Sequence, residues 1–199
     1  MATPIGHLLA GYAVGRGATL GTKPAQRNLL LYCMVLAVAP DLDFLPGLLQ
    51  GQPALYHQGI SHSLAFALVV SLIGALALRP RSYGLLATWG LLFAAYSSHL
   101  LIDLFGPDRR LPYGIPLFWP LSDSTYLSPL SIFWGMHHAA RTSATTAQWF
   151  AGIADLYNVG AILIEIVLIG PFAVLAEVVS RRKRSRQPGP VEQGRTECQ

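Results

Sequence analysis

Five apolar stretches, separated by short polar or proline-containing breaks, dominate the pattern of the chain. They are residues 5–14, 28–39, 62–78, 83–105 and 156–179. The last two are long enough to cross the hydrocarbon core of a bilayer, which takes about 20 residues in a helix. The first two are shorter, so they either span or only dip into the bilayer. The pattern predicts an all-α, multi-pass integral membrane bundle of four to five helices.

Proline, glycine and serine residues mark where these helices should begin and end. We expect the second helix to stop at Pro40, and the third to begin after Ser61 as N-cap and to stop at Arg79-Pro80. A long loop then follows the fourth helix, over residues 106–154, with a short helix expected at 144–153. No internal repeat divides the chain.

The composition supports a membrane protein. Hydrophobic residues make up 52% of the chain and charged residues only 12%, whereas a soluble domain carries about 25% charged residues. We therefore expect one membrane domain over residues 1–180 and a basic, disordered cytoplasmic tail over 181–199. No cleavable signal peptide is expected, because the first basic residue, Arg16, follows the first apolar stretch. His7 is then retained.

Basic residues predict the topology. The cluster Arg181 to Arg186, the turn 79–81, and Arg16, Lys23 and Arg27 all fall where a single alternating path places them in the cytoplasm. We interpret the C-terminal cluster as this signal and expect no nucleic-acid partner. The other ends of these helices then lie together at the outer face of the membrane.

Histidine and aspartate residues gather at that face. His99 and Asp103 are four residues apart on one helix, so both side chains can hold one ion. Further candidates lie at the edges of the other apolar stretches: His7, Asp41, Asp43, His57 and His62. Together they favour a divalent metal site at the outer face, zinc first, with manganese or iron as alternatives. Seven candidates are enough for two or more ions, as in phosphate-ester hydrolysis.

Each candidate also has an ordinary structural role. His99 and Asp103 could bond to each other inside the bundle, and Asp41 and Asp43 could cap helix ends. Histidines such as His57 are common at membrane interfaces. It is the convergence on one face that favours metal binding.

Three further polar positions and the tandem histidine have no assigned role at this point. Glu165 lies within the last apolar stretch, where it either bonds to another helix or completes a polar cavity. Arg109 and Arg110 follow the fourth stretch, and interfacial anchoring is favoured over clamping an anionic head group. His137 and His138 are expected to be surface residues of the long loop.

Five short motifs over residues 4–129 carry a family resemblance. They are Gly6-His7, Pro40-Asp41-Leu42-Asp43, His57-Gln58-Gly59-Ile60-Ser61-His62-Ser63, His99-Leu-Leu-Ile-Asp103 and Tyr113-Gly114-Ile115-Pro116-Leu117-Phe118-Trp119-Pro120. In this order the chain resembles the bacterial membrane-bound metal-dependent hydrolases, including the LexA-regulated inner-membrane member. The His-x-x-x-Asp pattern is more distantly similar to the zinc-dependent phospholipase C and P1 nuclease superfamily, all-helical enzymes that cleave phosphodiesters with clustered zinc ions.

The resemblance implies a ligand set and a location. The ligands would be His7, Asp41, His57, His62, His99 and Asp103, in a protein of the bacterial inner membrane. Gln58 departs from the family, which usually has arginine there; if that arginine binds an anionic substrate, the substrate class differs here.

The leading hypothesis is a hydrolase that cleaves a phosphoester of a membrane lipid or of a small anionic or lipid-linked substrate. Candidate catalytic residues are Asp41, Asp43 and His57, with Asp41 or Asp43 as general base. The first alternative is a metal-ion or proton transporter or channel, which needs polar residues through to the cytoplasmic face. Glu165 is the main candidate at that depth. The second is a structural protein stabilised by a closed metal site.

Overall fold

The structure is a computed structural model that describes residues 2–18, 24–52, 55–78, 83–108, 111–137 and 146–185. Within these ranges the regular elements are all helices, and Ile115 and Tyr126 form an isolated β-bridge. The predicted all-α membrane bundle is confirmed. The elements are α1 (Pro4–Ala18), α2 (Pro24–Val38), η1 (Ala39–Asp43), α3 (Phe44–Leu49), η2 (Ile60–His62), α4 (Leu64–Leu78), α5 (Leu85–Leu104), α6 (Thr146–Ala151) and α7 (Leu156–Ser185).

Three helical stretches in the described residues are long and apolar enough to cross a membrane. They are Gln26–Leu49, Leu85–Leu104 and Leu156–Ser185. The apolar helix α4 has 15 residues and is shorter than a full span. Large side chains such as Val167 and Phe172 point outward from α7, which fits a helix that faces lipid.

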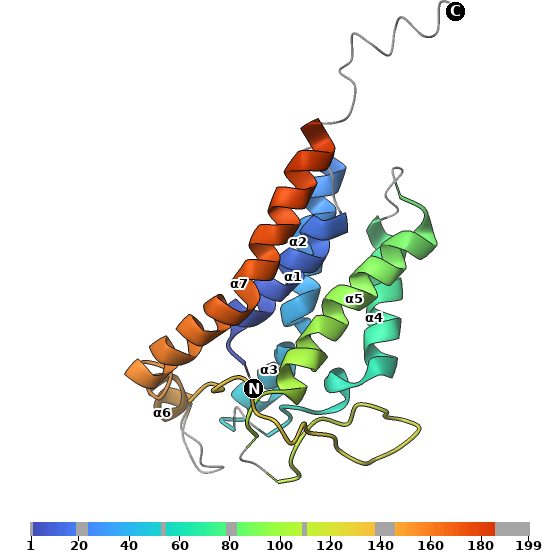
Figure 1. The fold of residues 1–199 in the computed structure, drawn as a ribbon. Coiled ribbons are helices and arrows are strands. Elements are labelled where there is room, and N and C mark those ends of the chain that lie inside the picture. Colours follow the sequence, from blue (N-terminus) through green and yellow to red (C-terminus); the bar gives the residue numbers. More distant parts are fainter. Residues whose placement is uncertain are drawn as a thin grey trace, which may run out of the picture.

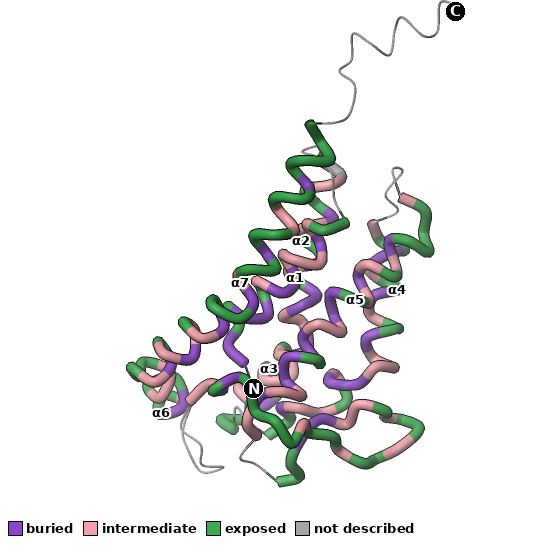
Figure 2. The backbone as a smooth tube through the Cα atoms, in the orientation of Figure 1, coloured by how far each residue is buried: buried purple, intermediate pink, exposed green. Residues whose placement is uncertain are grey.

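The bundle has two different ends (Figure 1). α1 packs against α2, α5 and α7, and α4 packs against α5. The first turns of α1 and α4 lie at the same end as the last turns of α2 and α5, beside α3 and the long loop. Figure 2 shows the buried backbone on the inward faces of these helices and the exposed backbone along the outer side of α7. The candidate ligands lie at the end that carries the loop.

The second α-helix ends just before Pro40, as predicted. α2 ends at Val38, and the chain continues through η1 and α3 as one helical stretch. Pro40 stands in the first turn of η1, where a missing N–H leaves no hydrogen bond unmade. Asp41 and Asp43 consequently lie on a short 3-10 helix rather than in a loop.

The N-cap of α4 is Ser63 and not Ser61 as predicted. The Oγ atom of Ser63 accepts a hydrogen bond from the N–H of Phe66 at 3.2 Å. The 3-10 turn η2 takes up residues 60–62, so the α-helix begins two residues later than the apolar pattern indicated. Ser61 is thereby available to the polar cluster.

α7 continues beyond the predicted boundary. The tail was expected to be disordered from residue 181, but α7 runs to Ser185. Basic residues Arg182, Lys183 and Arg184 stand in its last turn, where positive charge stabilises the helix end. Residues 186–199 lie outside the described residues, as does the turn 79–81. The expected loop helix is confirmed as α6.

Candidate metal centre

Four side chains from three elements converge at the loop end of the bundle. Asp41 comes from η1, His62 from η2, and His99 and Asp103 from the last turns of α5. Each offers one ligand atom, and these atoms all lie within 4.8 Å of one another. We call these residues the four-residue cluster.

Distances within the four-residue cluster are those of ligands around a common point. His99 Nε2 lies 3.3 Å from Asp103 Oδ2 and 3.5 Å from Asp41 Oδ1. His62 Nε2 lies 3.5 Å from Asp103 Oδ2 and 3.8 Å from Asp41 Oδ1. The two histidines and Asp103 are buried.

The orientation of His99 is fixed by the backbone of α2. Its Nδ1 atom lies 2.8 Å from the carbonyl oxygen of Ala37, which can only accept, so Nδ1 carries the proton. A neutral ring then has its lone pair on Nε2, 3.2 Å from Nε2 of His62. Two imidazole nitrogens turned toward each other at this distance are typical of metal ligands oriented by their outer hydrogen bonds.

Several buried polar atoms here have no hydrogen-bond partner among the described residues. They are Asp41 Oδ1, Asp103 Oδ2 and both ring nitrogens of His7. A buried unpaired acceptor costs about 1–3 kcal/mol. A divalent cation would satisfy the carboxylate oxygens and both Nε2 lone pairs, and two carboxylates would balance its charge. The donor set therefore fits zinc, manganese or iron.

His7 lies at the edge of the four-residue cluster. Its ring stacks on His99 with centroids 3.7 Å apart, and its Nε2 lies 3.5 Å from Asp103 Oδ1. That same Oδ1 atom accepts a hydrogen bond from the N–H of Ala2 at 3.0 Å. His7 is thus placed beside the cluster, as the sequence predicted, without being one of its four members.

Asp43, His57 and His62 form a second group. Asp43 Oδ1 lies 2.8 Å from His57 Nδ1, and Asp43 Oδ2 lies 3.2 Å from His62 Nδ1. The hydroxyl of Ser61 also donates to Asp43 Oδ2, at 2.8 Å. One carboxylate therefore orients two imidazoles, and His62 joins the second group to the four-residue cluster.

The two loop histidines differ in their affinity for protons. Burial lowers the pKa of His57 to about 4, although the hydrogen bond to Asp43 acts in the opposite direction. Burial also opposes protonation of His62, but its contacts with Asp103 and Asp43 outweigh this and raise its pKa to about 9. Without an ion, the carboxylates therefore hold a proton on His62, and a bound cation would compete with it.

A pocket of ≈ 870 Å³ opens beside the second group. Asp43, His57 and Ser61 line its polar side, while Phe66 and Val70 of α4 contribute apolar surface. The ring of Phe44 stacks on His57 with centroids 3.8 Å apart, which holds the imidazole against α3. The second group therefore borders a partly apolar cavity.

Glu165 bonds to another helix, the first of its two expected roles. Its carboxylate accepts hydrogen bonds from the N–H groups of Thr3 at 2.7 Å and Gly6 at 3.1 Å, and from the Thr3 hydroxyl. These are donors at the start of α1, which have no partner inside the helix. Glu165 therefore fixes the first turn of α1, and with it His7.

His137 is not a member of either group in the described part of the chain. His137 stacks on Tyr157 with centroids 3.7 Å apart and lies 3.5 Å from Asp155. Arg109, Arg110 and His138 fall outside the described residues. Sequence reasoning missed Ser61 as a site residue, although it lies between the two histidines of the same motif. Nothing in the sequence indicated that the carbonyl oxygen of Ala37 would accept a hydrogen bond from His99.

A model of the family described as YdjM inner membrane protein matches residues 1–183. The chain belongs to this family. Among characterised relatives, Inner membrane protein YbcI of Escherichia coli (strain K12) is 32% identical over 136 residues, which is 66% of this chain and 75% of YbcI. No solved structure matches. Membership of the YdjM family, with the apolar helices α2, α5 and α7, places the chain in a bacterial inner membrane.

Proposed function

We propose that this YdjM family member is a metal-dependent hydrolase that cleaves a phosphoester of a lipid or lipid-linked substrate. The observation that carries the proposal is the four-residue cluster of Asp41, His62, His99 and Asp103, in which one buried oxygen of each carboxylate has no hydrogen-bond partner among the described residues. It lies next to a pocket with a polar and an apolar side. A hydrolase of membrane lipids needs a metal site that adjoins a partly apolar substrate pocket.

Asp41, His62, His99 and Asp103 would hold the ion, with His7 beside them. Bound there, a divalent ion supplies Lewis acidity and lowers the pKa of a coordinated water. Asp43, His57 and His62 form a second group of possible donors, but we assign Asp43 and His57 to proton transfer rather than to a further ion. Zinc suits the nitrogen and oxygen ligands of the four-residue cluster, as manganese and iron also do.

His57 and Asp43 are the residues that we assign to proton transfer. Asp43 accepts the Nδ1 proton of His57, which directs the ring's basic lone pair to Nε2. Because burial keeps His57 neutral, the ring is in the form that can accept a proton. Ser61 donates to the other oxygen of Asp43 and so keeps the carboxylate in place.

The pocket lining favours an amphipathic substrate. An anionic ester group fits the side formed by Asp43, His57 and Ser61 once cations neutralise the carboxylates. An acyl or prenyl chain fits the side formed by Phe66 and Val70. A water-soluble phosphoester would leave that apolar surface uncovered.

The core beyond the site argues against a transport path. Between α2, α4 and α5 the buried positions are filled by Leu29, Cys33, Ala67, Ala75 and Leu92. The buried hydroxyls of Ser71 and Thr88 bond to carbonyls of their own helices. A conduit for ions needs polar groups or water along its length, so the polar cluster is better suited to chemistry on one side.

The orientation follows from the basic helix ends. The end of α1, which carries Arg16, the start of α2, which carries Arg27, and the last turn of α7 lie at the end of the bundle opposite the site (Figure 1). Since basic residues near helix ends favour the cytoplasm, we assign the C-terminus to the cytoplasm and the metal centre to the extracytoplasmic face.

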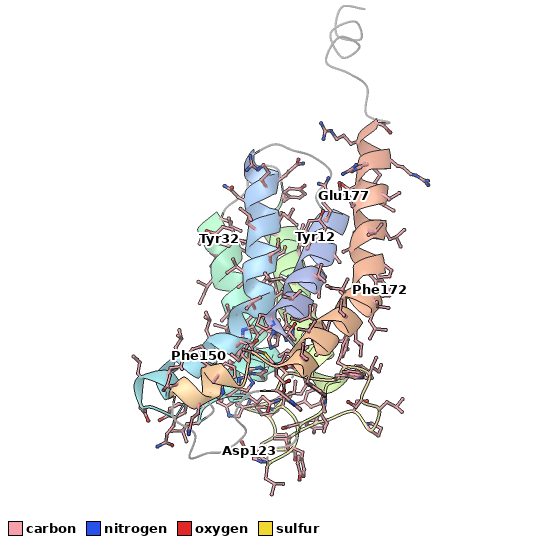
Figure 3. The ribbon with its side chains drawn as sticks, turned by 90° about the vertical axis from the view of Figure 1, so that its left-hand side faces the viewer. Tyr12, Tyr32, Asp123, Phe150, Phe172 and Glu177 are labelled. Carbon is pink, nitrogen blue, oxygen red and sulfur yellow. The ribbon has the colours of Figure 1, made fainter. Side chains whose placement is uncertain are left out.

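The test is hydrolysis by the purified chain in detergent, loaded with zinc or manganese and offered a panel of phospholipids and lipid-linked diphosphates. We expect release of a phosphorylated product that stops on chelation and in Asp103→Ala. The matched control, Asp123→Ala, removes an exposed carboxylate from the loop and should keep activity (Figure 3). If fully metal-loaded protein hydrolyses no phosphoester or acyl ester in the panel, the proposal is wrong.

A further inference from the structure

A groove of ≈ 620 Å³ runs between α1 and α7, away from the metal centre. Leu8 of α1, Val174 and Val178 of α7, and Met34 of α2 are among the residues that line it. Leu8 and Val174 are 37% and 63% exposed, so the groove opens on the outer surface of the helices. In a bilayer this surface meets acyl chains.

One end of the groove is polar and positively charged. Glu177 accepts hydrogen bonds from the Tyr12 hydroxyl at 2.8 Å, from Arg16, and from Arg181 Nε at 2.6 Å. Figure 3 shows Tyr12 and Glu177 close together on facing helices. Because one carboxylate stands between two guanidinium groups, this end has a net positive charge.

The next residues of α7 increase that charge. Arg182, Lys183 and Arg184 are exposed in the last turn of the helix and follow Arg181 directly. Basic clusters at the end of a membrane helix attract anionic head groups. Guanidinium groups also bind phosphate through two parallel hydrogen bonds.

We infer that this groove binds one anionic phospholipid, with an acyl chain along Leu8, Val174 and Val178 and its phosphate at Arg181. The apolar part of the groove matches the acyl chain of such a lipid, and its cationic end matches the phosphate. Both parts face the leaflet in which the basic end of α7 stands. The site is separate from the metal centre and does not depend on the proposed hydrolysis.

The test uses native mass spectrometry of the full chain in detergent, with phosphatidylglycerol and phosphatidylcholine of identical acyl chains. We expect one retained phosphatidylglycerol per chain and weaker retention of phosphatidylcholine. Val174→Trp fills the groove and should abolish retention, whereas Val167→Trp, on an exposed face of the same helix outside the groove, should not. Arg181→Gln should lower the preference for phosphatidylglycerol about fivefold, and the control Arg27→Gln, at a residue that does not line the groove, should lower it less.

Three results would overturn the inference. The first is equal retention of the two lipids by the wild-type chain. The second is equal loss in Val174→Trp and Val167→Trp, which would indicate only the general lipid shell around the helices. The third is a dimer that Val174→Trp disrupts, because it would assign the groove to a second copy of the chain.

Discussion

The Nδ1 atom of His99 lies 2.8 Å from the carbonyl oxygen of Ala37, in the last turn of α2. The last carbonyls of an α-helix have no partner within it, so this bond satisfies α2 and orients the imidazole at once. It also ties α5, which carries His99 and Asp103, to the stretch that leads into Asp41. The geometry of the four-residue cluster is therefore set by the packing of α2 against α5 before an ion binds.

Mutation should distinguish the role of the second group from that of the four-residue cluster. His57→Ala removes the residue that we assign to proton transfer but leaves the four-residue cluster intact. We expect the chain to keep metal at that cluster and to lose about 10²–10⁴-fold in hydrolysis rate. Elemental analysis and the lipid assay on the same preparation check this. Complete loss of metal from His57→Ala would instead make His57 a ligand of that cluster.

Removing Glu165 should destabilise the chain. Glu165→Ala leaves the N–H groups of Thr3 and Gly6 without their acceptor, at a cost of about 1–3 kcal/mol for each buried donor. Glu165→Gln keeps one acceptor oxygen and should lose less. The free energy of unfolding in detergent, measured by denaturant titration, checks both. Wild-type stability in the alanine variant would contradict the capping role.

Two glycines of α1 offer a matched comparison. A Cβ atom at Gly6 would lie 2.6 Å from Glu165 Oε2, whereas at Gly17 nothing lies within 4 Å. Gly6→Ala should therefore lower the free energy of unfolding by about 1–3 kcal/mol through overpacking. Gly17→Ala should raise it slightly, since alanine favours a helix. Equal effects of the two changes would exclude close packing of Gly6 on Glu165.

The hydrophobic pattern was sufficient for the helices and for the end of the bundle where the ligands meet. It misplaced the start of α4 at Ser61, because the 3-10 turn η2 displaces the N-cap to Ser63. The partner of Glu165 was beyond sequence reasoning, since its acceptor role depends on backbone N–H groups of another helix. Asp43 looked like one more ligand, and only its distances to His57 and His62 show that it orients both.

The long loop should lie in the membrane interface. Among residues 111–137 Asp123 is the one formally charged side chain, while Leu121 is 93% exposed and Trp134 is 49% exposed. Such surfaces are typical of interfacial belts. In vesicles, Leu121→Cys should react more slowly with a water-soluble maleimide than Ser124→Cys, in a chain lacking Cys198. Equal rates would place both residues in water.

Metal content is the most direct test of the four-residue cluster. Elemental analysis of detergent-purified protein should compare the wild type with His62→Ala, Asp103→Ala and the control Asp123→Ala. We predict at least one zinc or manganese ion per chain in the wild type and the control, and loss of that metal in the two cluster variants. A folded wild-type chain that binds no metal, or cluster variants that keep it, would contradict the metal centre.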